Sequence, residues 1–373
     1  MSANNKKANK VRNSNIELFK IISIFLIIIC HTVYSWGGID LADMSIDLYS
    51  ATTDVQTILL VFFRYFGIFG NAFFFICSAW FWVDSNDFRL EKEVFYVIEI
   101  WVVAVSILII CTLAKVQYGS AEMLRSLIPT FSGANWYMTC YLIFYPLHVV
   151  LNRVIERMDK PALFRAAVIL TFLYIICNFI HRAFYSSEII VWVAIYFVVA
   201  YTKKYLQDFC ESVKANLILL LVCTGGHIAL ILLTNLFILK WSVFDIDLLY
   251  WNEICNPFMV FAAISVLNLA RKIDFQSKLI NKISSLTLLI YIIHEDIELR
   301  TYVRPVVINY FCRIFENGNV VLIVLLIALL TFIAAVVVSY LYTLTLQRIV
   351  IKISQYISKF IIKIWTRIEN RIC

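Results

Sequence analysis

The sequence predicts an all-α polytopic membrane protein, a helical bundle with about ten transmembrane helices. Hydrophobic residues make up 62% of the 373-residue chain and charged residues only 15%. Soluble domains are instead about 45–50% apolar and about 25% charged. The apolar residues recur in runs of about 20, the length that a helix needs to cross a bilayer. A soluble globular fold is therefore excluded.

Ten apolar segments are candidate membrane-spanning helices. They comprise residues 16–36, 57–82, 94–115, 134–152, 163–181, 188–202, 214–239, 252–270, 283–308 and 320–346. The sixth segment is short and the ninth is irregular. Residues 16–346 thus form one transmembrane domain, preceded by a basic cytoplasmic tail at 1–15. Residues 347–373 form a basic amphipathic helix, which we expect to lie on the cytoplasmic leaflet.

The basic residues predict the topology. Of the 32 Lys and Arg residues, 23 fall in the alternate segments that include both termini, and seven fall in the intervening segments. Lys20 and Arg64 lie within spans. Because cytoplasmic loops carry the excess of positive charge, both termini are expected to be cytoplasmic. The dispersed basic residues would lie beside anionic membrane lipids, so the net charge of +7 does not indicate a nucleic-acid partner.

The first span carries Lys20 near one end and His31 near the other. Eleven residues correspond to three helical turns plus about 20°, so both side chains lie on one face, about 16 Å apart. Ionisable residues inside a membrane indicate a polar pathway. The alternative is that Lys20 extends to the interface and that His31 caps the helix. Arg64 lies at a similar depth in the second span, where it either shares a cavity with His31 or extends outward.

The ninth span has only about ten apolar residues before His294, Glu295 and Asp296. Ten helical residues cover about half of a hydrocarbon core about 30 Å thick. These polar groups are therefore expected near mid-depth or in a water-filled vestibule, unless a loop begins at His294. A carboxylate beside a buried histidine fixes its tautomer and makes it more basic, as a general base requires.

Other motifs give weaker signals. Three further histidines are less favoured as site residues: His148, His181 and His227. The ten cysteines fall mostly in apolar runs and contain no Cys-x-x-Cys pair, so disulfides and a zinc site are not expected. The chain has no P-loop, nucleophile-elbow or metal-ligand signature, and no metal site is predicted.

Four stretches, taken together and in order, resemble the acyltransferase-3 family of bacterial membrane acyltransferases. They are Lys20 to His31, Phe74-Phe75-Ile76-Cys77-Ser78-Ala79-Trp80, Trp136-Tyr137, and Ile290-Tyr291-Ile292-Ile293-His294. The resemblance covers residues 16–346. Two positions depart from the family pattern. Lys20 stands where the family has arginine, which loses the bidentate fork suited to phosphate, and Ala79 stands where the family has glycine.

The resemblance implies transfer of an acyl group, usually acetyl, from cytoplasmic acetyl-CoA or another acyl-CoA to a sugar hydroxyl. The acceptor would be a surface polysaccharide, a glycolipid or a wall precursor, and the location the bacterial cytoplasmic membrane. The acyl-CoA is a substrate, and no tightly bound cofactor is expected. His31 would act as base or acyl carrier, supported by His294 and Glu295. Lys20, Arg64 and Trp136 are expected to bind the donor, and Arg64 also has the alternative roles of stabilising the oxyanion or binding the acceptor.

A membrane carrier or flippase for a polar or glycolipid substrate is the alternative function. In that case the same polar residues would line a substrate route. No inverted repeat is visible in the sequence, which disfavours this interpretation. The acyl chain, the acceptor sugar, the oligomeric state and the side of the membrane on which transfer occurs are left open.

Overall fold

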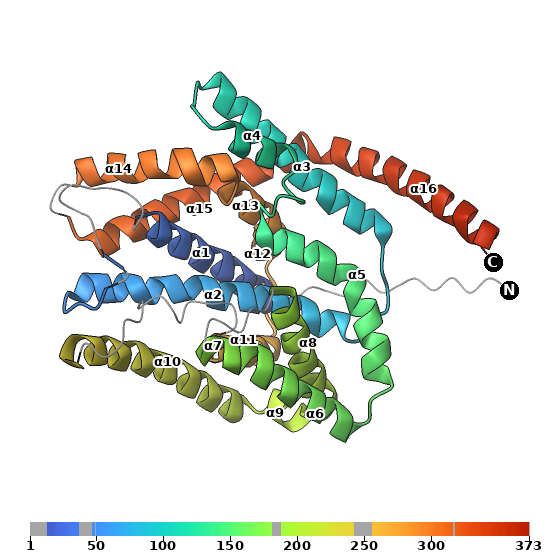
Figure 1. Cartoon of the computed structure of the whole chain (residues 1–373), viewed down its shortest axis with the longest axis horizontal. Coiled ribbons are helices and arrows are strands. Elements are labelled where there is room, and N and C mark those ends of the chain that lie inside the picture. Colours follow the sequence, from blue (N-terminus) through green and yellow to red (C-terminus); the bar gives the residue numbers. More distant parts are fainter. Residues whose placement is uncertain are drawn as a thin grey trace.

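The structure, a computed structural model, describes residues 13–36, 47–48, 50–180, 188–241, 256–315 and 318–372. All regular secondary structure within these ranges is helical (Figure 1). The elements in order are α1 (Ser14–Trp36), α2 (Val55–Trp82), α3 (Leu90–Leu113), α4 (Ser120–Leu127), α5 (Trp136–Glu156), α6 (Lys160–Thr171), η1 (Phe172–Ile176), α7 (Cys177–Ile180), α8 (Glu188–Tyr205), α9 (Gln207–Glu211), α10 (Val213–Trp241), α11 (Pro257–Lys272), α12 (Lys278–Ser284), α13 (Thr287–His294), η2 (Leu299–Val303), α14 (Arg304–Ile314), α15 (Val320–Leu344) and α16 (Gln347–Ile372).

The predicted fold class, an all-α multi-pass membrane protein, is confirmed. Among the described residues, six helices are long and apolar enough to cross a membrane: α1, α2, α3, α5, α10 and α15. The other four predicted spans are helical but shorter or interrupted. The fifth is divided by the π-helical turn η1, the sixth and eighth correspond to α8 and α11, and the ninth is broken. The total of ten spans and the cytoplasmic termini therefore stay predictions.

Helices α1 and α2 pack together at the centre of the bundle, and α1 also contacts α11, α12, α13, α14 and α15 (Figure 1). Two glycines of α2 allow this close approach. A Cβ atom at Gly67 would lie 2.5 Å from the Sγ atom of Cys30, and one at Gly70 would lie 2.7 Å from the carbonyl oxygen of Ser23. Small residues let membrane helices approach closely. Gly67 and Gly70 thus let the face of α2 that carries Asn71 lie close to α1.

The ninth predicted span is broken into four short helical pieces, which confirms its irregularity. Helix α12 ends at Ser284, α13 ends at His294, and the chain resumes through η2 into α14. The polar residues at the break are all buried: His294, Glu295, Asp296 and Glu298. Helix α13 packs against α1, α3 and α15, so the break brings these polar groups into the bundle rather than onto its surface.

The C-terminal segment forms helix α16, which packs against α3 and α15. The Gln347 side chain donates a hydrogen bond of 3.4 Å to the Glu99 carboxylate. Further along, Tyr356, Phe360 and Trp365 are exposed. Apolar and basic side chains on one exposed helix are typical of interfacial helices. Contact with the cytoplasmic leaflet, which the sequence predicts, stays a prediction.

Candidate active site

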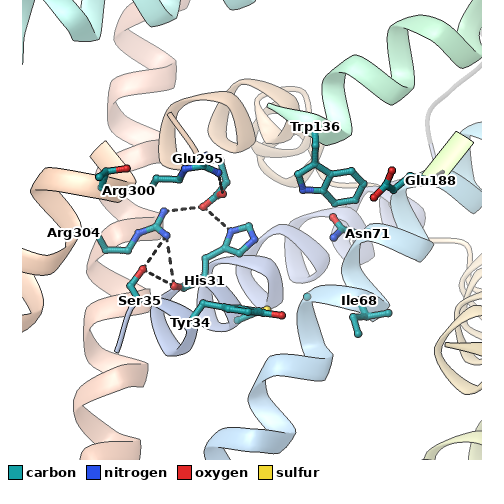
Figure 2. Close-up of a pocket in the computed structure, with 13 residues that line it drawn as sticks. His31, Tyr34, Ser35, Ile68, Asn71, Trp136, Glu188, Glu295, Arg300 and Arg304 are labelled. Carbon is teal, nitrogen blue, oxygen red and sulfur yellow. Dashed lines mark hydrogen bonds and ion pairs between the residues drawn. The ribbon is translucent and has the colours of Figure 1, made fainter. Parts of the chain in front are cut away.

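A cavity of about 550 Å³ opens beside the C-terminal half of α1. Side chains from α1, α2, the first residues of α5 and α8, and the segment 295–304 line it (Figure 2). The volume lies within the range of about 300–1,000 Å³ that is typical of small-molecule sites. The cavity therefore forms where segments far apart in the sequence meet, and it includes His31 and Glu295.

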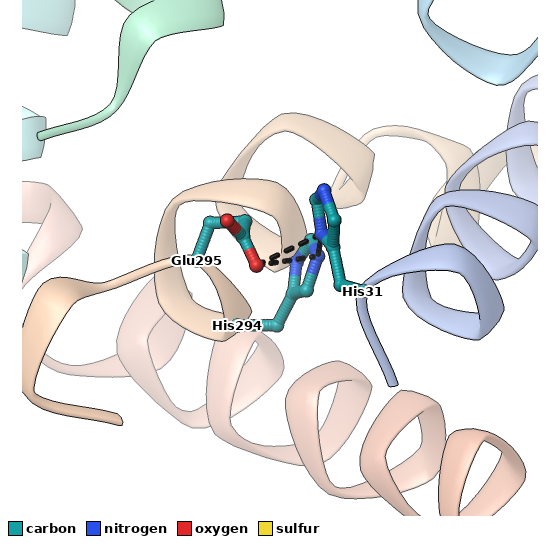
Figure 3. A group of neighbouring side chains, drawn as sticks. All are labelled: His31, His294 and Glu295. Atoms are coloured by element: carbon teal, nitrogen blue, oxygen red, sulfur yellow. Dashed lines mark hydrogen bonds and ion pairs between the residues drawn. The ribbon is translucent and has the colours of Figure 1, made fainter. Parts of the chain in front are cut away.

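His31 meets the polar break of the ninth span (Figure 3). Its Nδ1 atom lies 2.8 Å from Oε1 of Glu295 and 3.1 Å from Nε2 of His294. The two imidazole rings are stacked, with centroids 5.3 Å apart. The sequence predicted that these three residues belong to the site, and the structure brings them into direct contact.

The hydrogen bonds assign the histidine tautomers. The Nδ1 atom of His294 lies 3.0 Å from the carbonyl oxygen of Ile290. A carbonyl oxygen only accepts, so this nitrogen carries the hydrogen and Nε2 of a neutral His294 is an acceptor. In the neutral form of His31, Nδ1 is then the donor toward His294 and Glu295, and Nε2 carries the lone pair.

Arg304 holds the two halves of this arrangement together (Figure 2). Its Nη2 atom donates to Oε1 of Glu295 at 2.8 Å and to the carbonyl oxygen of His294 at 2.5 Å. Its Nη1 atom donates to Ser35 Oγ at 3.3 Å and to the carbonyl oxygen of His31 at 3.5 Å. One guanidinium thus spans α1 and the end of α13. A planar fork of donors is suited to such a bridge, and a lysine ammonium is not.

Arg300 is the second cation at the cavity. Its Nη1 atom lies 3.6 Å from Oε2 of Glu295, and 36% of its side chain is exposed. Neither Arg300 nor Arg304 was expected from the sequence to have a role in the site. The sequence offered a signal for such a role. Both arginines follow His294 and Glu295 within ten residues, in a segment predicted to lie on the side of the membrane that has few basic residues. Intramembrane arginines near carboxylates commonly pair with them.

The three residues expected to bind the donor lie in different environments. Trp136 lines the cavity. Arg64 is buried and lies over the ring of Tyr34, 3.2 Å from its centroid. Tyr34 lines the cavity and Arg64 is not among the described lining residues. Lys20 is also outside the lining and lies 3.4 Å from Oε1 of Glu17. The structure therefore places Trp136 beside His31 but separates Lys20 and Arg64 from the cavity.

The weaker histidine candidates lie away from the cavity. His148 is buried and stacks on Trp82. His227 is buried beside Tyr65, and its Nδ1 atom accepts a hydrogen bond from Asn256. His181 lies outside the described residues. Both described histidines pack inside the bundle, and Nε2 of each has no hydrogen-bond partner among the described residues.

The second-span stretch at 74–80 is also separate from the cavity. Its last residue, Trp80, is buried. The guanidinium of Arg271 lies 4.3 Å from the ring centroid, and the Nζ atom of Lys203 lies 5.1 Å from it. Lys203 also forms an ion pair of 2.6 Å with Asp84. This stretch therefore anchors α8 and α11 on α2, where cations over an aromatic face are favourable.

His31, His294 and Glu295 also resemble a metal-ligand set, because their nearest donor atoms all lie within 4.8 Å of one another. The surrounding charges oppose a divalent cation. Arg304 lies 2.8 Å and Arg300 3.6 Å from the same carboxylate. Both cations would repel a divalent metal ion bound to that carboxylate. A metal would also have to replace the hydrogen bonds of His31. The residues present fit a proton-transfer site better than a metal site.

A partly exposed histidine that contacts a carboxylate beside a cavity is an arrangement that suits acyl transfer. The sequence model of the acyltransferase-3 family, described as an acyltransferase domain, matches residues 13–344. The chain belongs to this family, and membrane acyl transfer is the activity that the family indicates. No curated protein and no solved structure matches the chain.

Proposed function

We propose that the protein is an O-acyltransferase that moves an acyl group, in the simplest case acetyl, from cytoplasmic acyl-CoA to a sugar hydroxyl. The acceptor would belong to a cell-surface polysaccharide, a glycolipid or a wall precursor, and the protein to the cytoplasmic membrane of a bacterium. One observation carries the proposal. Nδ1 of His31 lies 2.8 Å from Glu295, and in the neutral ring this arrangement supports Nε2 as the base.

The chemistry requires a base and a partner for the developing negative charge. In the first route, Nε2 of His31 takes the proton of the sugar hydroxyl while its oxygen attacks the thioester carbonyl. The new C–O bond forms, the C–S bond breaks, and the imidazolium returns its proton to the leaving CoA thiolate. Glu295 stabilises the imidazolium, as the carboxylate of a catalytic triad does.

In the second route, Nε2 of His31 attacks the thioester carbonyl, so that a C–N bond forms, the C–S bond breaks and CoA leaves as its thiolate. The sugar hydroxyl then attacks the acyl-imidazolium, the new C–O bond forms as the C–N bond breaks, and the hydroxyl proton passes to the CoA thiolate, which regenerates neutral His31. Both routes pass through Nε2 of His31. Arg300 is the better candidate for the oxyanion in either route, because it lines the cavity and Arg64 does not. Removing one such donor typically costs about 10²–10³ in rate.

Lys20 is proposed to contact the phosphates of the donor at the cytoplasmic end of α1. Its side chain is 25% exposed and lies 3.4 Å from Glu17. Glu17 also accepts a hydrogen bond from Ser284, so it keeps a partner within the bundle when a phosphate takes its place beside Lys20. This assignment rests on the expected topology, in which the N-terminal end of α1 faces the cytoplasm.

The test measures acetyl transfer by the purified protein in nanodiscs. Isotope-labelled acetyl-CoA is supplied with glycan acceptors, and mass spectrometry detects labelled acetyl esters. We expect His31→Ala to lower transfer by about 10²–10⁴-fold while the amount of protein inserted in the membrane is unchanged. Transfer by His31→Ala at the wild-type rate would contradict the mechanism.

Two controls separate the alternatives. Glycan movement across the bilayer without consumption of acetyl-CoA would support the carrier interpretation instead. A chelator is added in parallel, because activity that depends on an added divalent ion would replace the base mechanism with a metal-assisted one.

A further inference from the structure

The cavity has two chemically different walls (Figure 2). On one side of His31, Glu295 pairs with both Arg300 and Arg304. On the other side lie Trp136 and Asn71, with Glu188 beside them. The mechanism above uses the first wall and leaves the second without a role.

One polar atom of the second wall has no hydrogen-bond partner among the described residues. The Oδ1 atom of Asn71 is buried and accepts no hydrogen bond from any described residue. A buried acceptor left without a partner costs about 1–3 kcal/mol, so it is expected to bind a ligand or water. Glu188 is exposed and lines the same cavity. Both arginines at the cavity already pair with Glu295, so the Glu188 carboxylate remains uncompensated within the described cavity lining.

The combination of side chains indicates the ligand chemistry. The indole of Trp136 offers a large flat apolar face, which suits the C–H face of a sugar ring. The Asn71 amide oxygen and the Glu188 carboxylate are hydrogen-bond acceptors, which suit neighbouring hydroxyl groups. An uncompensated carboxylate repels anionic ligands, including a uronic acid and the phosphates of a nucleotide donor.

We propose that Trp136, Asn71 and Glu188 form the acceptor-binding wall of the active site, and that they hold a sugar ring without negative charge. The ring presents one hydroxyl to Nε2 of His31. The inference rests on the proposed function for the presence of an acceptor. It assigns Trp136 to the acceptor, whereas the sequence analysis assigned it to the donor.

Binding is tested separately from catalysis. Saturation-transfer NMR on the protein in nanodiscs measures the affinities of methyl β-glucoside, which is neutral, and methyl β-glucuronide, which is anionic. We expect the wild type to bind the glucoside more tightly. Glu188→Gln should lower the affinity for the glucoside by about tenfold, the effect of losing a hydrogen bond to a charged group. The same variant should raise the affinity for the glucuronide.

Trp136→Ala should lower the affinity for both ligands, and Trp136→Phe should keep part of the affinity for the glucoside. Glu122→Gln is the matched control, since it removes the same charge from α4, and Glu122 is not among the described lining residues. It should leave both affinities unchanged.

The outcomes distinguish the two proposals. Equal affinities for the two glycosides in the wild type and in Glu188→Gln, or no saturable binding of either glycoside, would overturn the acceptor wall. If the binding pattern is present but no acetyl is transferred, the acceptor wall stands and the proposed function fails. If acetyl is transferred but the binding pattern is absent, the proposed function stands and the acceptor wall fails.

Discussion

The two ends of helix α1 carry similar pairs with different origins. Near its start, Lys20 lies 3.4 Å from Glu17, and Glu17 also accepts a hydrogen bond from Ser284. Near its end, His31 lies 2.8 Å from Glu295. Each carboxylate therefore links α1 to the segment 284–295.

The difference lies in which chain segment supplies the carboxylate. Glu17 is three residues from Lys20 on the same helix, so this pair can form in an isolated helix. Glu295 comes from a broken helix near the other end of the chain, so its pair with His31 forms only in the assembled bundle. Long-range pairing of a buried ionisable group is typical of a functional site. The local pair is more readily exchanged for another ligand.

The largest effect is expected from Glu295→Gln. The amide cannot stabilise an imidazolium and does not fix the His31 tautomer as a carboxylate does. We expect the rate of acetyl transfer to fall by about 10²–10⁴-fold. The matched variant Glu17→Gln should change the rate by less than about fivefold, because Glu17 contacts Lys20 and Ser284 and is not among the described residues that line the cavity. Similar losses in both variants, measured with labelled acetyl-CoA, would contradict the distinction between the two ends.

Arg304→Lys is expected to have an intermediate effect. The ammonium keeps the charge beside Glu295 but cannot reach the carbonyl oxygens of His31 and His294 together with Ser35. We expect kcat to fall by about tenfold and the thermal unfolding temperature to drop by a few degrees, since each lost hydrogen bond contributes about 1 kcal/mol. A wild-type kcat in this variant would mean that Arg304 acts only through its charge.

The smallest effect is expected from Lys20→Ala. If Lys20 binds the phosphates of the donor, KM for acetyl-CoA should rise by about tenfold while kcat changes little, as for a group that binds substrate and transition state equally. Lys20→Arg should lower KM below the wild-type value, because guanidinium binds phosphate in a bidentate manner. An unchanged KM for acetyl-CoA in both variants would remove Lys20 from the donor site.

Much of the fold was predictable because it depends on hydrophobicity along the chain. All ten apolar segments are helical where described, and the early end of the ninth span followed from its short apolar run. The sequence also predicted that His31, His294 and Glu295 act in one site; the structure places the three side chains in contact, and their role stays a prediction. These are the features that a one-dimensional pattern encodes.

The sequence did not predict the rotation of each helix about its axis. Arg64 and His31 have similar depths, yet the structure directs Arg64 onto Tyr34. The glycine contacts at Gly67 and Gly70 set how closely α2 approaches α1. Such contacts depend on the partner surface, which the sequence of α2 alone does not contain.

The π-helical turn η2 at Leu299–Val303 contains Arg300 and ends immediately before Arg304, and both arginines reach Glu295. A π turn accommodates one residue more than an α turn, and such turns occur frequently at functional sites. Deleting one residue here would restore α-helical register and rotate α14 by about 100° relative to α13, which would carry Arg304 away from the carboxylate. In this stretch, chain length constrains the protein as strongly as residue identity does. A homologue one residue shorter between 298 and 304 would need another cation to hold α1 against the end of α13.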